Sequence, residues 1–516
     1  MAVDLESKVA SHSTPALLLS LATSRTNEPD LEDFTGLCTV ALAYLTYEQF
    51  QTALVESDSF PVLQQALYDS YTRFDIAGAD PDVAEQLKQV WNASVTILAD
   101  ISALPAFAAK YPLDSPVVQR LATWLGSPAS YSHLQTAACL SLGNLSRSDA
   151  ASISLVQSAL SPLLAILSRA IPTSPSQPQL PISERPSAQL LHAALGFLKN
   201  LAIPQANKPT IGNALLSPPQ PILPRLWTTT NAQPQVQFAT VSLTRLLLIN
   251  NPSSVALLCA PLPPSPETYT TRDGPALSNL HILMNISLRA DAEPTKMEAA
   301  RAICAVARVL QAPEHYRVLP SSWTWGDQTP EATTARARFY EAHAAPLTKT
   351  LANQLANKKF PVLRSEAIFV LAMLAKSATD GGKLAVRVLE SPEACRVLVD
   401  AVAGRAMSDE EWEVVEGGRV TEVVEGEEGK DSTAAAVPAF ATGLVDGLGI
   451  EPQQADAKQA AGIAKIDREN GLVLGAEIIR GFLGELAPRR RMLLEQVLSE
   501  GGKLVLEDRK AGQGAQ

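Results

Sequence analysis

The chain has 516 residues, of which 46% are hydrophobic but only 5% aromatic, and its formal net charge is −11. A chain of this length is too long to fold around one compact core, unless it is built of stacked repeats. Its composition favours packed helices over a β-sandwich. The negative charge argues against a nucleic-acid interface, which requires a basic face. No stretch approaches the roughly 18 consecutive apolar residues of a membrane-spanning helix.

The cysteines and the first apolar run indicate in which cellular compartment the protein is located. Five cysteines are scattered along the chain without a Cys-x-x-Cys pair, which is typical of free thiols in a reducing environment. The apolar run Pro15–Ala22 lacks a basic leader, so it predicts a first helix rather than a signal peptide. A helical stretch is expected to follow from Glu32 to Asp75. We therefore expect a cytoplasmic protein without membrane insertion.

One short pattern occurs twice near the middle of the chain, in Ala138–Leu145 and in Ala194–Leu201. Both copies have a small residue, then apolar residues four and seven positions later, and an Asn at the sixth. At about 100° per residue the apolar positions form one stripe of a helix, and the Asn lies roughly 120° away, where it faces solvent or a partner. A repeated helix of this kind is typical of an α-solenoid.

Further copies follow the same alignment. They lie at 94–101, 237–246, 302–309 and 367–374, and they place Asp100, Arg245, Arg308 and Met373 at the Asn position. The copies are spaced more widely than the 40–47 residues of an armadillo-type unit. The additional residues between copies coincide with Pro-rich stretches at 171–187, 217–224, 261–266 and 319–330. We interpret these stretches as loop insertions because proline cannot continue a helix. The predicted fold class is an all-α, armadillo-type α-solenoid.

The composition changes near Gly404. Residues 1–405 are predicted to form the repeat solenoid, and residues 406–455 an acidic, Gly-rich, disordered linker. Ten acidic residues stand against two basic ones between Asp409 and Asp431. Helical periodicity returns in residues 456–506, which we predict to be a helical segment that caps the solenoid, followed by a disordered tail at 507–516.

The repeated Asn suggests a binding function. In an armadillo superhelix the third helix of each repeat lines a groove, and Asn144 and Asn200 would point into it. An Asn amide both donates and accepts, so a ladder of Asn side chains can bind an extended backbone. The alternative is that each Asn is solvated or caps a turn. Nuclear import adaptors carry a Trp four residues before this Asn; Leu140 and Gly196 stand there instead, which argues against import cargo.

Between Ser132 and Leu258 the sequence resembles the small-GTPase GDP-dissociation stimulators of the SmgGDS type. The resemblance is carried by Leu142–Ala150, His192–Pro204 and Pro234–Leu247, which match three consecutive repeats in order. They include the ending Asn-Leu-Ala-Ile-Pro at Asn200–Pro204. A generic armadillo protein would share the apolar stripe but not these polar and Pro residues.

The resemblance implies an armadillo solenoid that binds small GTPases of the Rho/Ras superfamily, whose tails are basic and prenylated. Such proteins promote GDP release or chaperone the GTPase, and the partner's prenyl group is a possible ligand. By resemblance, Asn144 and Asn200 are the principal partner-binding residues, and Arg147, Lys199 and Arg245 are neighbouring candidates. The alternative function is a generic armadillo adaptor that binds extended peptides or other proteins.

Enzymatic chemistry is not indicated. The six histidines show no His-x-x-x-His or His-Glu-x-x-His spacing, and the chain has no phosphate-binding Gly-x-x-x-x-Gly-Lys-Ser/Thr loop and no Gly-x-Ser-x-Gly elbow. We therefore expect no catalytic residue, no metal site and no cofactor.

Overall fold

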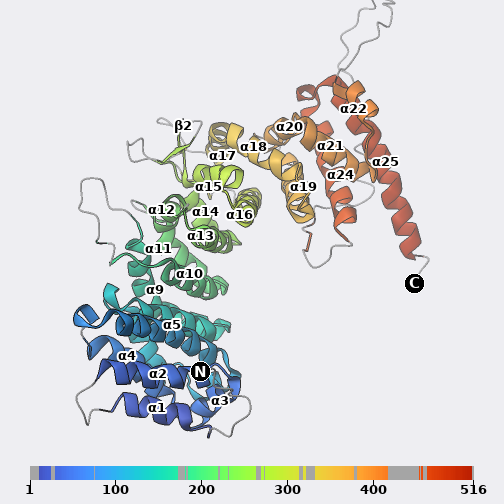
Figure 1. Cartoon of the computed structure of the whole chain (residues 1–516). Coiled ribbons are helices and arrows are strands. Elements are labelled where there is room, and N and C mark those ends of the chain that lie inside the picture. The colour runs from blue at the N-terminus through green and yellow to red at the C-terminus, as the bar shows by residue number, and fades with distance from the viewer. Residues whose placement is uncertain are drawn as a thin grey trace, which may run out of the picture. The chain divides into compact units, whose positions relative to one another are not determined.

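The computed structural model of the chain is built of helices that stack one repeat after another (Figure 1). The residues that it describes are 11–24, 30–74, 76–171, 181, 184–218, 221–230, 232–262, 269–271, 274–312, 318–320, 323, 332–376, 380–416, 453, 455–456 and 462–513. The chain divides into two compact units, unit 1 from Met1 to Leu247 and unit 2 from Leu248 to Gln516. The prediction of an all-α solenoid is confirmed by this arrangement.

Unit 1 consists of short helices. They are α1 (Thr14–Ala22), α2 (Leu31–Tyr44), α3 (Glu48–Glu56), α4 (Phe60–Thr72), η2 (Ile76–Gly78), α5 (Pro81–Ala103), α6 (Pro105–Lys110), α7 (Pro116–Leu125), η3 (Ala129–Tyr131), α8 (Ser132–Leu145), α9 (Asp149–Ser168), α10 (Ala188–Leu201), η5 (Gln205–Asn207), α11 (Lys208–Leu216), α12 (Ile222–Thr229) and α13 (Pro234–Leu248), whose last residue passes the unit boundary. Each copy of the repeated pattern in unit 1 lies within α5, α8, α10 or α13.

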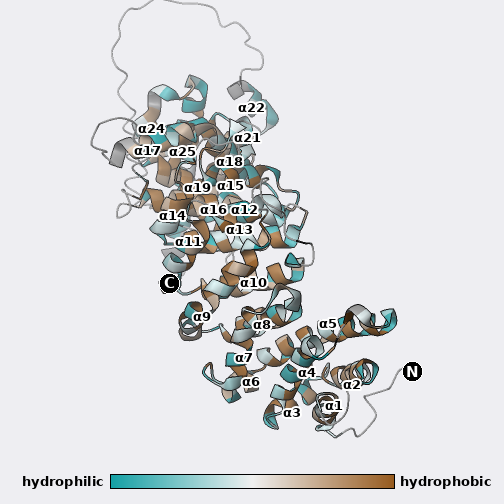
Figure 2. Ribbon diagram, turned by 90° about the vertical axis from the view of Figure 1, so that its left-hand side faces the viewer, coloured by the Kyte–Doolittle hydropathy of each residue, from teal (hydrophilic) through white to brown (hydrophobic). Residues whose placement is uncertain are grey.

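Four helices of unit 1 form a row in which α2 packs on α5, α5 on α8, and α8 on α10, and the last three of them carry the repeated pattern. We call these the third helices. The stripe residues Ala138 and Ala194 are fully buried, and so is Leu198. A small side chain at this position lets neighbouring helices approach closely, and hydrophobic and hydrophilic residues are interspersed along these helices (Figure 2).

Many prolines lie at the beginning of helices, whereas the sequence interpretation placed them in loop insertions. Among the described helices, α5, α7 and ten others carry a Pro in their first two positions, where the missing N–H has no intrahelical partner to lose. The expected insertion at 217–224 is also corrected, because it ends inside α12, where Pro224 is the third residue. Residues 172–180, 263–268 and 324–330 of the other expected insertions lie outside the described residues.

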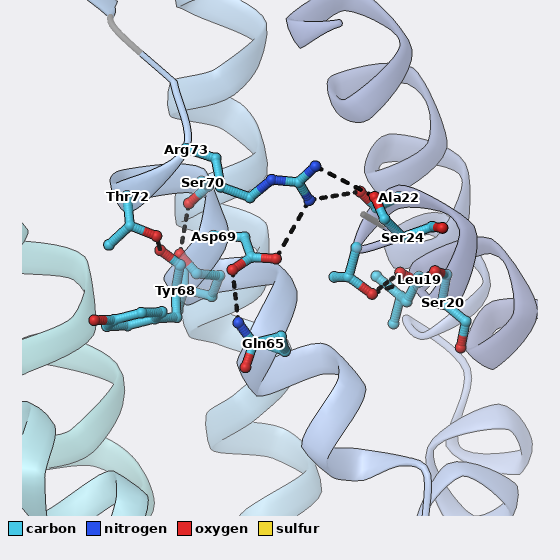
Figure 3. Close-up of polar contacts among 12 residues, drawn as sticks. Leu19, Ser20, Ala22, Ser24, Gln65, Tyr68, Asp69, Ser70, Thr72 and Arg73 are labelled. Atoms are coloured by element: carbon cyan, nitrogen blue, oxygen red, sulfur yellow. Dashed lines mark hydrogen bonds and ion pairs between the residues drawn. The ribbon is translucent and has the colours of Figure 1, made fainter. Parts of the chain in front are cut away.

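A partly buried ion pair joins α4 to the end of α1 (Figure 3). Arg73, which follows the last residue of α4, donates to the carbonyl oxygens of Ala22 and Ser24 at 3.4 and 3.3 Å; Ala22 is the last residue of α1, and Ser24 follows the helix. Its guanidinium also pairs with Asp69 at 3.4 Å, and Gln65 donates to the other oxygen of that carboxylate at 2.6 Å. Arg73 therefore satisfies carbonyl groups that the end of a helix leaves unpaired.

Helix α9 is long and apolar enough to cross a membrane by length and composition, with a mean hydropathy of 1.7. In the structure it packs against α7, α10 and α11. Its buried residues, among them Leu155, Leu163 and Leu167, lie on one face, while Ser154 and Ser158 are exposed. That division is typical of an amphipathic helix of a repeat.

Unit 2 contains the later copies of the pattern. Its elements are α14 (Pro252–Leu258), the antiparallel pair β1 (Thr270–Thr271) and β2 (Gly274–Pro275), α15 (Asn279–Arg289), α16 (Glu293–Gln311), α17 (Ala332–Ala342), α18 (Ala344–Leu355), α19 (Pro361–Ala375), α20 (Asp380–Leu389), α21 (Pro392–Ala403), α22 (Asp409–Glu416), α24 (Ile463–Phe482), η9 (Leu483–Glu485) and α25 (Pro488–Gln513). Here α16 packs on α19 and α19 on α24, so these three are the third helices of unit 2.

The end of the repeats differs from the sequence interpretation in two respects. Helix α21 ends at Gly404, whose positive φ of 68° forms a left-handed C-cap, and α24 and α25 pack on α19 and α21. Helix α22 occupies part of the expected linker, and residues 417–450 lie outside the described residues. Helix α25 continues to Gln513 through most of the expected tail, because Leu504 and Val505 still lie against the core.

A buried histidine joins two elements of unit 2. The Nε2 atom of His343 lies 2.8 Å from Oγ of Ser278, the N-cap residue of α15, and its Nδ1 atom lies 2.9 Å from the carbonyl oxygen of Phe339. The side chain of His343 is fully buried, and this burial lowers its pKa to about 4. The ring is therefore neutral at pH 7, with Nδ1 donating and Nε2 accepting.

We predict that this histidine makes unit 2 sensitive to acid. Because its folded pKa lies below the ordinary value of 6.5, its contribution is complete above pH 6.5 and is lost as the pH falls towards 4. Over that pH range the free energy of unfolding falls by about 3 kcal/mol because of this residue. Urea denaturation measures the free energy of unfolding of the wild type and of His343→Gln. The difference between the two should shrink by this amount as the pH is lowered from 6.5 to 4. A stability difference that does not depend on pH would contradict the assignment.

Candidate functional site

The two predicted Asn residues lie near the C-terminal ends of neighbouring third helices, Asn144 on α8 and Asn200 on α10. Both side chains are half-buried. Each therefore lies at the border between the exposed face of its helix and the contact with the preceding third helix.

The amide of Asn144 is engaged inside the repeat array. Its Nδ2 donates to the carbonyl oxygen of Ala99 at 2.9 Å and to Oγ of Ser102 at 3.2 Å, both on α5. Its Oδ1 accepts from Nη2 of Arg147 at 3.0 Å. Asn144 thus joins α8 to α5 and also orients Arg147.

Asn200 makes the same contact one repeat later. Its Nδ2 donates to the carbonyl oxygen of Gly143 on α8 at 2.8 Å. Within the described residues its Oδ1 accepts no hydrogen bond. A Cβ at Gly143 would lie 3.8 Å from Phe197 and 3.9 Å from Nδ2 of Asn200, so the two helices approach closely at this point.

The two contacts share one register. In the alignment of the repeats Asp100 occupies the position of Asn144, and Asn144 donates to the residue immediately before it, Ala99. Asn200 in turn donates to Gly143, the residue immediately before Asn144. The Asn pattern therefore marks a hydrogen bond between consecutive third helices. We name Asn144, Asn200 and these bonds the amide ladder.

This geometry differs from the expectation that both amides face a partner. The N–H group of each amide donates to the preceding third helix instead. A helical projection places the Asn on the side facing solvent, but in the solenoid that side lies against the preceding repeat. Sequence reasoning missed the acceptor residues Ala99 and Ser102. Ser102 carries no periodic signal, and a backbone carbonyl can belong to any residue.

The exposed strip of this face contains the remaining candidates. Arg147 and Lys199 are exposed, and Arg245 is half-exposed on α13. The exposed strip across α5, α8 and α10 also includes Thr96, Asp100, Leu140, His192 and Gly196, of which Leu140 is half-buried. The strip presents both charges and little apolar surface.

Aromatic contacts fix the opposite end of α8. The hydroxyl of Tyr71 on α4 lies 2.6 Å from Nδ1 of His133, and the ring of Tyr71 stacks on Trp91 of α5 with centroids 4.4 Å apart. Burial lowers the pKa of His133, so its neutral ring accepts the hydrogen bond from Tyr71. Both ends of α8 are thus joined to α5.

The residues that the structure describes include no group of three or more His, Cys, Asp or Glu side chains arranged to hold a metal ion. All five cysteines are buried. Burial raises the pKa of the Cys38 thiol to about 12 and that of Cys139 further still, so neither thiol is reactive at neutral pH.

No protein-family model matches the chain, and no curated protein matches it in sequence. The crystal structure of SYS-1 is similar with a TM-score of 0.36 and 11% identity, covering 92% of this chain and 80% of SYS-1. The crystal structure of importin beta is similar with a TM-score of 0.25 and 13% identity, covering 95% of this chain and 61% of importin beta. At these values neither likeness bears on function, and the solenoid fold rests on the helices described above.

We predict that the amide ladder stabilises unit 1. Asn144→Ala and Asn200→Ala should each lower the free energy of unfolding by about 1–2 kcal/mol, because each removes a half-buried hydrogen bond between helices. Asn92→Ala, at an exposed position of α5, is the matched control and should change it by less than about 0.5 kcal/mol. Urea denaturation followed by circular dichroism measures all three. Equal values for ladder and control variants would contradict the assignment.

Proposed function

We propose that this chain is a protein-binding α-solenoid and that its partner is a small GTPase of the Rho/Ras type. The partner lies along the exposed strip of α5, α8 and α10. Two points support the proposal: three consecutive repeats resemble, in order, those of a GTPase-binding solenoid family, and the two Asn residues of that pattern occupy equivalent places in the fold.

The amide ladder supports the proposal indirectly. It holds α5, α8 and α10 in fixed register, so the exposed side chains between its bonds keep constant spacing. Arg147 is oriented by Asn144, and Lys199 precedes Asn200. Preorganised side chains lose little conformational entropy on binding. Arg147 and Lys199, rather than the two amides, are therefore the proposed contact residues.

The mechanism requires no chemistry from the solenoid. A protein that binds the nucleotide-free GTPase more tightly than the GDP-bound form weakens GDP binding by the same factor. Escort of a prenylated GTPase through the cytosol is a second consequence of the same binding. A generic adaptor is the alternative, and it predicts binding that is insensitive to the nucleotide state.

A charge-reversal pair tests the proposal. Arg147→Glu with Lys199→Glu should reduce the acceleration of mant-GDP release from a Rho-type GTPase by about tenfold, because both changes reverse the charge of a proposed contact residue. Lys110→Glu with Arg120→Glu makes the same change of charge on exposed positions of α6 and α7, and should alter the rate by less than about twofold.

Two results would contradict the proposal. The first is equal behaviour of the two variant pairs. The second is failure of the wild-type chain to bind the GTPase in either its GDP-bound or its nucleotide-free form. Binding that is equal for every nucleotide state would instead favour the adaptor.

A further inference from the structure

Helices α15 and α18 of unit 2 pack against each other (Figure 1) and share a pocket of about 260 Å³ that opens to solvent. Among the described residues that line it, all but Thr271 belong to these two helices. His281, Asn285 and Arg289 follow one another at intervals of four residues, which places them on one side of α15. Lys349 on α18 lines the same pocket. Polar side chains from both helices therefore meet in one place.

The two helices that form the pocket are joined at their N-terminal ends. The hydrogen bond of 2.8 Å between Ser278 and His343 connects the N-cap residue of α15 to the N-cap residue of α18. Both of these side chains are fully buried, and so is Met284, which lines the pocket. The pocket is therefore preformed by the packing of α15 on α18, as small-ligand sites usually are.

The pocket is positively charged, although the chain as a whole has a net charge of −11. Arg289 and Lys349 line it and are exposed, and neither α15 nor α18 contains an Asp or a Glu. Within the part of the chain that the structure describes, neither side chain makes an ion pair or a hydrogen bond. Arg301 and Arg364 of the same unit, by contrast, each bind a carboxylate, at 3.3 and 3.0 Å. The two cations of the pocket are available to a ligand.

The chemistry of the lining favours an anion with two negative charges. A guanidinium group donates through a planar fork, an ammonium group is a compact point charge, and both bind phosphate oxygens. Asn285 donates to the hydroxyl of Tyr269 at 3.2 Å through one N–H of its amide, which has a second N–H to offer. A phosphate monoester carries a charge of about −1.5 to −2 at pH 7, which two cations neutralise. A single carboxylate would leave one of the cations uncompensated.

The size of the pocket limits the ligand. Pockets for drug-sized molecules have about 300–1,000 Å³, so this smaller one holds a phosphate group with a short carbon stem rather than a nucleotide. Leu288 and Pro346, both half-buried, provide apolar lining that the carbon atoms of such a stem can contact.

We propose that the pocket between α15 and α18 binds a phosphate monoester group and that Arg289 and Lys349 hold its oxygens. The recognising chemistry is the same whether the group belongs to a small ester or to a phosphoserine side chain of another protein. The pocket lies wholly within unit 2, so the proposal does not depend on the binding of a GTPase to unit 1.

The test uses the full-length chain and isothermal titration calorimetry. The ligands are glycerol 2-phosphate and three pentapeptides capped at both ends, Ala-Ala-X-Ala-Ala with phosphoserine, glutamate or serine at X. We expect saturable binding of a phosphate ligand, at least about fivefold weaker binding of the glutamate peptide, and no binding of the serine peptide. Equal or tighter binding of glycerol 2-phosphate assigns the pocket to small esters, whereas tighter binding of the phosphoserine peptide assigns it to a phosphorylated protein.

A pair of double variants locates the site. Arg289→Gln with Lys349→Gln should weaken the tighter phosphate ligand by at least about tenfold, because it removes charge-assisted hydrogen bonds. Arg387→Gln with Lys503→Gln is the matched control, since it also removes one Arg and one Lys from exposed positions of unit 2, but outside the pocket. It should change the affinity by less than about twofold. All four positions are exposed, so both variants should fold, as circular dichroism will show.

Three results would overturn the proposal. The first is equal affinity of the pocket variant and the control variant for the phosphate ligand. The second is equal binding of the phosphoserine and glutamate peptides in the absence of tighter binding of glycerol 2-phosphate. The third is the absence of binding of both phosphate ligands to the wild-type chain. None of these results bears on the GTPase proposal, because neither variant alters Arg147 or Lys199.

Discussion

The hydrogen bond from a third-helix Asn to the backbone of the preceding third helix is the contact on which the organisation of unit 1 depends. Apolar stripes alone let helices slide, because hydrophobic burial is non-directional. A directional bond from Asn144 to Ala99, repeated from Asn200 to Gly143, fixes which residues face each other. Every exposed side chain of α5, α8 and α10 takes its position from that register.

The same residue type has two uses in this chain. In unit 1 its amide joins helices, and the exposed strip beside it is the proposed place of a partner. In unit 2 both amide groups of Asn470 on α24 pair with the backbone of Gln453, a residue outside any helix. An Asn at a third-helix position therefore does not by itself indicate a ligand. What its donor and acceptor contact decides its role.

Periodicity in the sequence could predict the helix positions, the burial of Ala138 and Ala194 and the all-α solenoid. The apolar stripe of a helix depends only on the spacing of residues within that helix. Asn144 shows where that reasoning ends, since a helical projection cannot tell solvent from a neighbouring repeat. Prolines were assigned to insertions, although many begin helices. The contact of Asn470 with Gln453 lay beyond prediction, because its partner belongs to an acidic stretch without periodicity. Binding of a GTPase at Arg147 and Lys199 stays a prediction.

Hydrogen exchange measured by mass spectrometry tests the central claim most directly, in a variant that combines Asn144→Ala and Asn200→Ala. If the amides hold the third helices in register, backbone amides of α5, α8 and α10 will exchange faster than in the wild type. Those of α19 and α24 in unit 2 will be unchanged. Unaltered exchange in α8, together with loss of GTPase binding, would contradict the account and return both Asn residues to the partner interface.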